Sequence, residues 1–252
     1  MEQFTSVEET YTFVLIHGAW HGSSHWQPLQ AELTTAGQKT IAPELPAEDP
    51  GATFDDDTAA VRDSIADREN LFLVVHSRGV ETLPRVLDQL DLARVVGALV
   101  LCSGGPRDFE LNIPSQYGKL QRNTDEFRSG ITTTADGLFQ IYDPQTARKV
   151  FYADVSQTLT ELAVRGLRKQ RIPCQREAEL PPMPQEIPTW FMLGTQDRAL
   201  NLDRARLVSE EWLGPNALLE FPTGHTPQLA KPAELGQLLL YLANLARVQR
   251  RR

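Results

Sequence analysis

Cysteines and long apolar runs are both scarce in this chain of 252 residues. Cys102 and Cys174 are too few for a disulfide framework, and their single use suits the reducing cytosol. No apolar run approaches the length that crosses a bilayer, and the acidic start MEQFTSVEET lacks the pattern of a secretory signal. We therefore expect a cytoplasmic protein that has no membrane partner.

Basic residues are also in the minority. The chain has 25 lysines and arginines against 33 aspartates and glutamates, which gives a formal net charge of −8 at pH 7. A negative protein repels a phosphate backbone, so we expect no nucleic-acid partner. The basic stretch from Arg247 to Arg252 is short and typical of a solvated chain end. The length and the apolar fraction of 41% favour one large globular domain.

Short apolar runs alternate with amphipathic stretches, which is the pattern of a parallel sheet covered by helices on both faces. Pro84 lies inside one expected helix, which it should kink or split. Strands are expected at Thr12 to Ile16, Thr40 to Pro43, Leu71 to His76, Val95 to Cys102, Thr189 to Gly194 and Ala217 to Phe221. Helices are expected at Ser24 to Ala36, Asp56 to Asp67, Arg78 to Leu90, Asp203 to Trp212 and Ala233 to Ala246.

Residues 106–186 interrupt this alternation. The segment ITTTADGLFQIY contains a DG turn and predicts a small hairpin, and helices are expected at Pro144 to Tyr152 and Ser156 to Lys169. We interpret 106–186 as an inserted lid, with 1–105 and 187–252 as the core. Its rings could line an aromatic pocket, and at least half of them should instead pack the lid against the core. They are Phe109, Tyr117, Phe127, Phe139, Tyr142, Phe151 and Tyr152.

A serine stands where an apolar strand runs into a helix. The strand LFLVV leads directly into His76, Ser77, Arg78 and Gly79. A hydroxyl at such a turn is exposed above the carboxyl edge of the sheet, where the helix N-terminus supplies free N–H groups. Ser77 is therefore a candidate nucleophile for acyl transfer. Taken alone, this tetrapeptide is equally well explained by a serine that caps the helix.

Two later strand ends supply the partners that a nucleophilic serine needs. A base must take its proton, and a carboxylate must fix the tautomer of that base. Asp197 follows the strand TWFMLG, and His225 follows the strand ALLEF. Singly, Asp197 could be a loop cap and His225 a surface histidine. Together, in the order Ser, Asp, His at three strand ends, they predict a catalytic triad of Ser77, Asp197 and His225.

The first strand ends in the glycine-bearing turn HGAW. Because glycine lets a backbone approach a substrate closely, we expect the N–H groups of Ala19 and Arg78 to form an oxyanion hole. Gly18 and Trp20 are the expected substrate contacts. An ordinary turn is the alternative explanation. The side chain of Arg78 could meet an anionic group of a substrate, or it could be solvated or paired within the structure.

Histidines recur every four residues at His17, His21 and His25, which could form a metal site. That spacing makes one face only on a continuous helix. His17 ends a strand, and Gly18 and Gly22 interrupt the segment. We therefore expect neither a metal nor a cofactor.

Four segments together resemble the α/β-hydrolase family that includes plant methyl-ester esterases, hydroxynitrile lyases and bacterial carboxylesterases, some acting on pyrethroids. They are FVLIHGAWHGSSHW, VVHSRG, LGTQDRAL and GHTPQLAKPAEL, within the span from Phe13 to Leu240. The resemblance implies an α/β-hydrolase fold with a mostly parallel six-stranded sheet, helices on both faces and an inserted helical lid. It also implies a possible homodimer, because related enzymes are often dimers.

The resemblance also bears on the reaction. Hydroxynitrile lyases of this family carry a threonine in the oxyanion turn and a lysine beside the catalytic histidine, where this chain has Gly18 and Thr226. It therefore implies hydrolysis of a small hydrophobic or aromatic carboxylic ester by a serine esterase. The usual elbow glycines are replaced by Val75 and Val80, which keeps a second hypothesis open: the same triad as base in a cofactor-free lyase or cyclase. A third is a ligand receptor without turnover.

Overall fold

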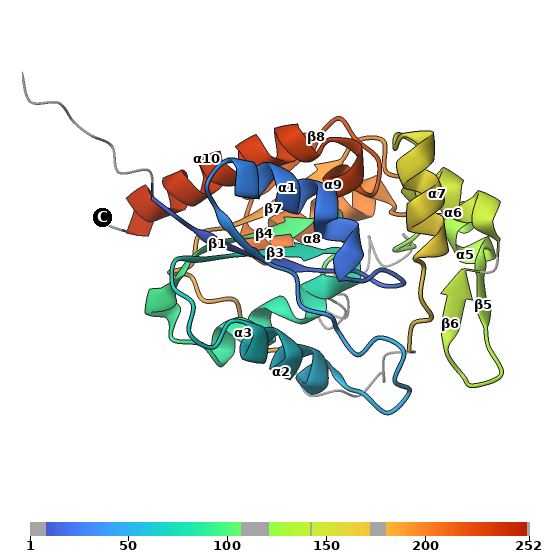
Figure 1. Cartoon of the computed structure of the whole chain (residues 1–252), viewed down its shortest axis with the longest axis horizontal. Helices are drawn as coiled ribbons and strands as arrows, with labels where there is room; N and C mark the ends of the chain where they lie inside the picture. Colours follow the sequence, from blue (N-terminus) through green and yellow to red (C-terminus); the bar gives the residue numbers. More distant parts are fainter. Residues whose placement is uncertain (1–8, 107–120, 142, 172–179, 251–252) are drawn as a thin grey trace, which may run out of the picture.

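A computed structural model of the protein describes residues 9–106, 121–141, 143–171 and 180–250. Its centre is a six-stranded sheet with strand order β2-β1-β3-β4-β7-β8, in which every neighbouring pair is parallel (Figure 1). This confirms the predicted six-stranded sheet. The strands are β1 (Thr12–Ile16), β2 (Lys39–Ile41), β3 (Leu71–His76), β4 (Val95–Leu101), β7 (Thr189–Gly194) and β8 (Leu218–Phe221).

The central strands are apolar throughout because both faces of the sheet are covered. Every residue of β1, β3 and β4 is buried. Along β1, Val14 and Ile16 pack into one apolar cluster, whereas Phe13 and Leu15 pack into a cluster on the other face. A continuous apolar strand of this kind is the expected signature of a buried parallel sheet.

Helices form a layer on each face of the sheet (Figure 1). The first apolar cluster joins the sheet to α2 (Phe54–Ser64), α3 (Leu83–Asp88) and α8 (Leu202–Leu213). The second joins it to α1 (Gln27–Thr35) and α10 (Pro232–Arg250). Among the helices of the described residues, none is both long and apolar enough to cross a membrane.

The helix expected at 78–90 is split, as Pro84 predicts. A 3-10 turn, η2 (Ser77–Glu81), follows β3 directly, and α3 begins with Pro84 in its first turn. Proline is tolerated there because the first N–H groups of a helix have no partner within the helix. The remaining short elements of the core are η1 (Ser23–Trp26), η3 (Leu92–Arg94) and α9 (Pro227–Ala230).

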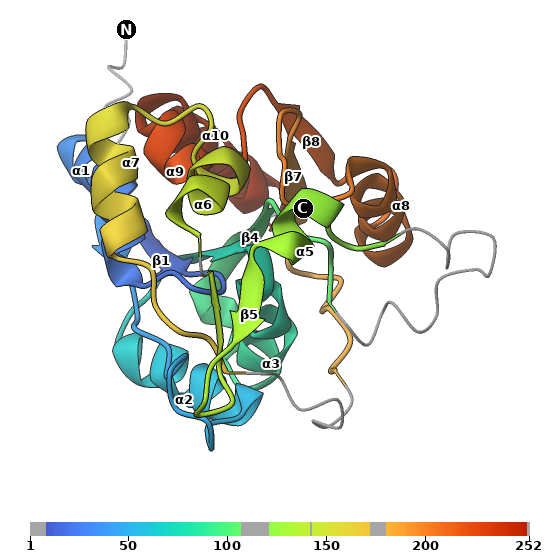
Figure 2. The ribbon, with the colours of Figure 1, turned by 90° about the vertical axis from the view of Figure 1, so that its right-hand side faces the viewer.

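The chain between β4 and β7, residues 102–188, is called the β4–β7 segment below. Its described helices and strands gather at one end of the sheet, on the right in Figure 1 and toward the viewer in Figure 2. The predicted hairpin and both predicted helices are present. The elements are α5 (Asp125–Ser129), β5 (Ile131–Thr133), β6 (Phe139–Ile141), α6 (Pro144–Phe151) and α7 (Gln157–Arg165).

The prediction for the aromatic residues of this segment can be compared with the structure at four of the seven positions. Of the seven aromatic residues expected to line or pack the lid, Phe127 and Phe151 are buried in one apolar cluster with Trp20. Tyr152 and Phe139 also belong to or pack against that cluster. The other three aromatic residues and one of the cysteines lie outside the described residues. They are Phe109, Tyr117, Tyr142 and Cys174.

Candidate active site

Ser77 is the first residue of η2 and occupies the sharp turn that follows β3. Its φ is +50°, a left-handed conformation that residues other than glycine rarely adopt and that often marks functional sites. Gly79 permits the tight turn, because a Cβ there would lie 3.0 Å from the carbonyl oxygen of His17. Val75 and Val80, at the positions where the family that the sequence resembles has glycine, are buried in the apolar cluster beneath the turn. The elbow therefore forms with valine at both positions.

Asp197 and His225 are in direct contact. They follow the neighbouring strands β7 and β8, and His225 Nδ1 donates to Asp197 Oδ2 over 2.7 Å. Both side chains are buried. The other carboxylate oxygen, Oδ1, accepts the N–H groups of Ala199 at 2.7 Å and Leu200 at 3.1 Å. The carboxylate is thus fixed, and because Nδ1 carries the proton, Nε2 of His225 has a free lone pair to act as base.

The loop of His225 also meets the elbow. His76 Nε2 donates to the backbone oxygen of His225 over 2.9 Å, and the two rings are 4.9 Å apart. Ser103, just past β4, donates its hydroxyl to the backbone oxygen of Ser77 over 3.0 Å. The structure therefore joins Asp197 to His225 directly, and His76, the neighbour of Ser77, joins the turn at Ser77 to the loop of His225.

The turn that holds the predicted oxyanion donor passes against the serine. A Cβ on Gly18 would lie 2.9 Å from the Cβ of Ser77. His17 Nδ1 donates to the Gly18 oxygen over 2.9 Å, and Leu45 N–H donates to His17 Nε2 over 3.0 Å. Burial lowers the pKa of His17 to about 4, so this ring is neutral at pH 7. Because C=O and N–H of one trans peptide point opposite ways, the Ala19 N–H points away from His17.

Trp20 connects this turn to the β4–β7 segment. Its φ is +61°, and the residue is 8% exposed. The indole meets the ring of Phe127 edge-on at 5.5 Å and lies 6.3 Å from Phe151. The residue predicted to contact substrate thus lies in an apolar cluster made largely by that segment.

The side chain of Arg78 is paired within the structure. Its Nη2 donates to Asp57 Oδ2 over 3.0 Å, and Arg171 donates to both oxygens of the same carboxylate. All three side chains are buried, and the ring of Phe54 lies 4.9 Å below the Arg78 guanidinium. Of the roles considered for Arg78, the structure thus shows the paired one.

Two polar residues near the predicted triad, Tyr152 and Asp154, were not among the site residues predicted from the sequence. Tyr152 bridges two of the regularly spaced histidines, since its hydroxyl lies 3.0 Å from His21 Nε2 and 3.3 Å from His25 Nε2. Asp154 accepts the backbone N–H of Gly224 over 2.7 Å. Within the described ranges, no group of three or more His, Cys, Asp or Glu residues is arranged to hold a metal ion. The sequence contains five histidines, and the structure brings them close together. Their number was the only feature of the sequence that pointed to a hydrogen-bond network here.

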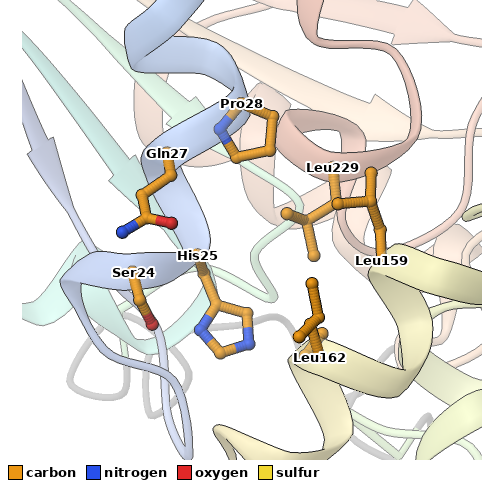
Figure 3. Close-up of a pocket in the computed structure, with 8 residues that line it drawn as sticks. Ser24, His25, Gln27, Pro28, Leu159, Leu162 and Leu229 are labelled. Carbon is orange, nitrogen blue, oxygen red and sulfur yellow. The ribbon is translucent and has the colours of Figure 1, made fainter.

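A cavity of about 290 Å³ opens beside His25, between η1, α1, α7 and α9 (Figure 3). Its walls are mostly apolar, with polar groups from Ser24, His25 and Gln27. The residues of the predicted triad are not among those that line it. The lining residues are Ser24, His25, Gln27, Pro28, Leu159, Leu162, Ala163 and Leu229.

Comparison with known proteins adds an independent observation. The model of the alpha/beta hydrolase family matches residues 13–238. Methylesterase 3 from Arabidopsis thaliana is 24% identical, over 92% of this chain and 95% of the relative. A solved pyrethroid hydrolase from Sphingobium faniae JZ-2 has a TM-score of 0.75 at 22% identity, covering 94% of this chain and 98% of that one. Tomato methylketone synthase I also has a TM-score of 0.75, at 18% identity, covering 94% and 99%.

Proposed function

Since the chain belongs to the alpha/beta hydrolase family, we propose that it is a serine esterase that hydrolyses a small hydrophobic or aromatic carboxylic ester. Ser77 is the nucleophile, His225 the general base and Asp197 the carboxylate that orients the base. The methylesterase relatives, similar over nearly their whole length, support ester hydrolysis. The triad needs no cofactor for this reaction.

One observation carries the proposal. His225 Nδ1 and Asp197 Oδ2 form a buried pair 2.7 Å apart, and the loop of His225 is bonded to His76, which precedes a serine held at a φ of +50°. A neutral histidine held in this tautomer can take the serine proton, and a fixed carboxylate then stabilises the imidazolium that forms. Structural roles alone do not call for a strained serine next to an oriented histidine.

The proposed reaction follows from these roles. Ser77 Oγ attacks the ester carbonyl while His225 Nε2 takes its proton, and the proton then passes to the leaving alcohol. The acyl group stays on Ser77 until water, deprotonated by His225, releases the acid. The N–H groups of Ala19 and Arg78 stabilise the oxyanion in both steps. Losing one such donor typically lowers the rate roughly 100-fold to 1,000-fold.

Substrate contact is assigned to the turn and the segment above it. Gly18 lets the turn approach the acyl carbon, and Trp20 forms one wall of the pocket. Residues 106–186 act as the lid, and 1–105 with 187–252 as the core. The aromatic cluster of Trp20, Phe127 and Phe151 supports a hydrophobic or aromatic substrate. Location in the cytoplasm and assembly as a homodimer stay predictions from the sequence.

A second candidate function keeps the fold and the triad but uses His225 as base in a cofactor-free lyase or decarboxylation reaction. Its support is the likeness to methylketone synthase I, crystallised with β-ketoheptanoate, together with Val75 and Val80 in the elbow. This function predicts that simple esters are not turned over while Ser77 or His225 is still needed for another substrate.

Labelling with a fluorophosphonate tests the proposal. Intact masses are compared for the wild type, Ser77→Ala and His225→Ala, with Ser24→Ala as a control beside the separate cavity. We expect a single adduct on Ser77 in the wild type and in Ser24→Ala, none in Ser77→Ala, and little in His225→Ala. A folded wild type that takes no adduct would rule out the esterase and favour the lyase or a ligand receptor. A panel of aryl and alkyl esters then identifies the acyl group.

A further inference from the structure

The turn at the end of α6, residues Phe151 to Asp154, contacts the loop of the proposed base on both sides of His225. Thr226 donates its hydroxyl to the Phe151 oxygen over 2.6 Å. Gly224 donates its backbone N–H to Asp154 Oδ2 over 2.7 Å. The residues immediately before and after His225 are therefore both anchored to this turn.

The contact at Gly224 is close as well as polar. A Cβ on Gly224 would lie 2.6 Å from Asp154 Oδ1, so a larger residue would displace the carboxylate or the loop. The ring of Phe151 lies 5.4 Å from the ring of His225, which completes the contact on the apolar side. The backbone at His225 is thus held by the turn above it as well as by the sheet below.

Tyr152, in the same turn, is connected through His21 to Ala19 in the proposed oxyanion turn. His21 Nδ1 lies 2.6 Å from the Ala19 oxygen, which can only accept, so Nδ1 carries the proton. His21 Nε2 then accepts from the Tyr152 hydroxyl, and His25 Nε2 donates to the Tyr152 oxygen. Burial lowers the pKa of His21 well below its usual value and that of His25 to about 4, so both rings are neutral at pH 7. The donor and the acceptor of each hydrogen bond in this series are therefore fixed: His25 donates to Tyr152, Tyr152 to His21, and His21 to the Ala19 oxygen.

We propose that Tyr152 and Asp154 are positioning residues for catalysis: Tyr152 fixes the oxyanion turn through His21, and Asp154 fixes the loop of His225. Phe151, Tyr152 and Asp154, all within one short turn, thus contact both the loop of His225 and the histidine that binds the Ala19 oxygen. The β4–β7 segment thus contributes to the rate of the chemical steps as well as to substrate choice. This inference rests on the proposed esterase function.

The kinetics of two variants test the two contacts separately, one made by Tyr152 and one by Asp154. Tyr152→Phe removes only the hydroxyl, and Asp154→Ala removes the acceptor for the Gly224 N–H. Because small misplacement of reacting groups can lower a rate on the order of 100-fold, we expect kcat to fall about 10-fold to 100-fold in each variant. The KM should change little, because neither group is among the proposed substrate contacts, Gly18 and Trp20. Tyr241→Phe, at an exposed tyrosine of α10, is the matched control and should react like the wild type.

Conservative replacement separates positioning from a loss of folding. In Asp154→Asn the side-chain oxygen still accepts the Gly224 N–H, so its kcat should recover most of what Asp154→Ala loses. Asp154→Ala should also shift the downfield proton resonance of His225 Nδ1, whereas Tyr152→Phe should leave it in place. Tyr152→Phe should instead weaken binding of a trifluoromethyl ketone, which forms an oxyanion, more than binding of the product acid. A higher kcat in Asp154→Asn than in Asp154→Ala would show that the lost activity depends on the hydrogen bond to Gly224.

The outcomes distinguish this inference from the function beneath it. A wild type that resists the fluorophosphonate overturns both. A wild type that is labelled on Ser77, with Tyr152→Phe and Asp154→Ala labelled at the same rate and with unchanged kcat, overturns the positioning roles alone. Equal losses in Asp154→Asn and Asp154→Ala would overturn the role assigned to Asp154. If the two contacts act on separate loops, the rate losses should multiply in the double variant.

Discussion

Gly18 and Ser77 are so close that a Cβ atom on the glycine would lie 2.9 Å from the Cβ atom of the serine. The same added atom would also lie 2.9 Å from His76 Nδ1. Because neither neighbour is the far end of a flexible chain, either the turn that holds Gly18 or the turn at Ser77 must move to accept a side chain at position 18. The proximity of these two residues explains why the turn carries glycine there.

Gly18→Ala should therefore reduce esterase activity by at least about 100-fold, through displacement of the oxyanion turn from the serine. Steady-state kinetics with an aryl ester would measure this. Gly236→Ala is the control, because its nearest neighbour would be 3.5 Å away and the site lies inside α10. That change should keep full activity and raise the free energy of unfolding by about 0.5–1 kcal/mol. Full activity in Gly18→Ala would argue against the assigned oxyanion turn.

Asp197→Asn should leave the fold intact and lower kcat by roughly 10,000-fold, the size of effect known for triads of this type. The amide nitrogen would face His225 Nδ1, which now donates to the carboxylate, and so would favour the wrong tautomer. Comparison of kcat with that of Asp203→Asn, an exposed aspartate of α8, isolates the effect. A loss of less than about tenfold would show that Asp197 is not the orienting carboxylate.

Asp57→Ala should destabilise the protein by about 3–5 kcal/mol, since it leaves the buried guanidinium groups of Arg78 and Arg171 without their shared carboxylate. Urea unfolding followed by circular dichroism would measure the change. Asp203→Ala removes the exposed ion pair with Arg206 and should have little effect. Similar unfolding midpoints for both variants would show that Asp57 contributes little to stability through Arg78 and Arg171.

Acid should destabilise the protein between pH 6.5 and about 4. Burial lowers the pKa of His17 and His25 to about 4 and that of His21 and His76 well below the usual 6.5. Between these pH values the histidines of the unfolded chain bind protons, whereas those of the folded chain stay neutral. Stability is full above pH 6.5 and falls as the pH drops toward 4, by about 1.4 kcal/mol per pH unit for each such histidine.

Urea midpoints at several pH values between 7.5 and 4.5 would measure this slope. His25→Gln should make it shallower by one proton. Carboxylates with lowered pKa values, such as Asp56 and Asp136, titrate below this window, because their usual value is 3.8. A midpoint that does not change between pH 7 and pH 5 would show that the histidines are not held neutral.

The sheet and the order of the site residues were predictable because they follow from local patterns. Apolar runs marked the strands, Pro84 marked the split helix, and strand ends marked the positions of Asp197 and His225. The partners of Arg78 were not predictable, because Asp57 and Arg171 lie in different elements far along the chain. No periodicity marks such contacts, which depend on how the elements pack.

The hydrogen bonds that link the proposed oxyanion turn to Tyr152 were even less predictable from the sequence. Tyr152 and His21 are 131 residues apart, and Asp154 and Gly224 are 70 apart. The spacing of His17, His21 and His25 was visible in the sequence and considered for metal binding. In the structure His17 donates to the turn, and the other two histidines join Tyr152. Residue types can be read from a sequence, whereas the direction of a hydrogen bond requires the folded neighbours.

The double anchoring by residues 151–154 sets a rule for exchanging parts between related hydrolases. A chimaera that takes the β4–β7 segment of a relative also replaces the groups that hold Gly224 and Ala19 in place. New substrate walls introduced in this way would arrive with a turn unsuited to the recipient loops. Grafts that keep Phe151, Tyr152 and Asp154 while changing the flanking helices should preserve turnover and leave selectivity free to vary.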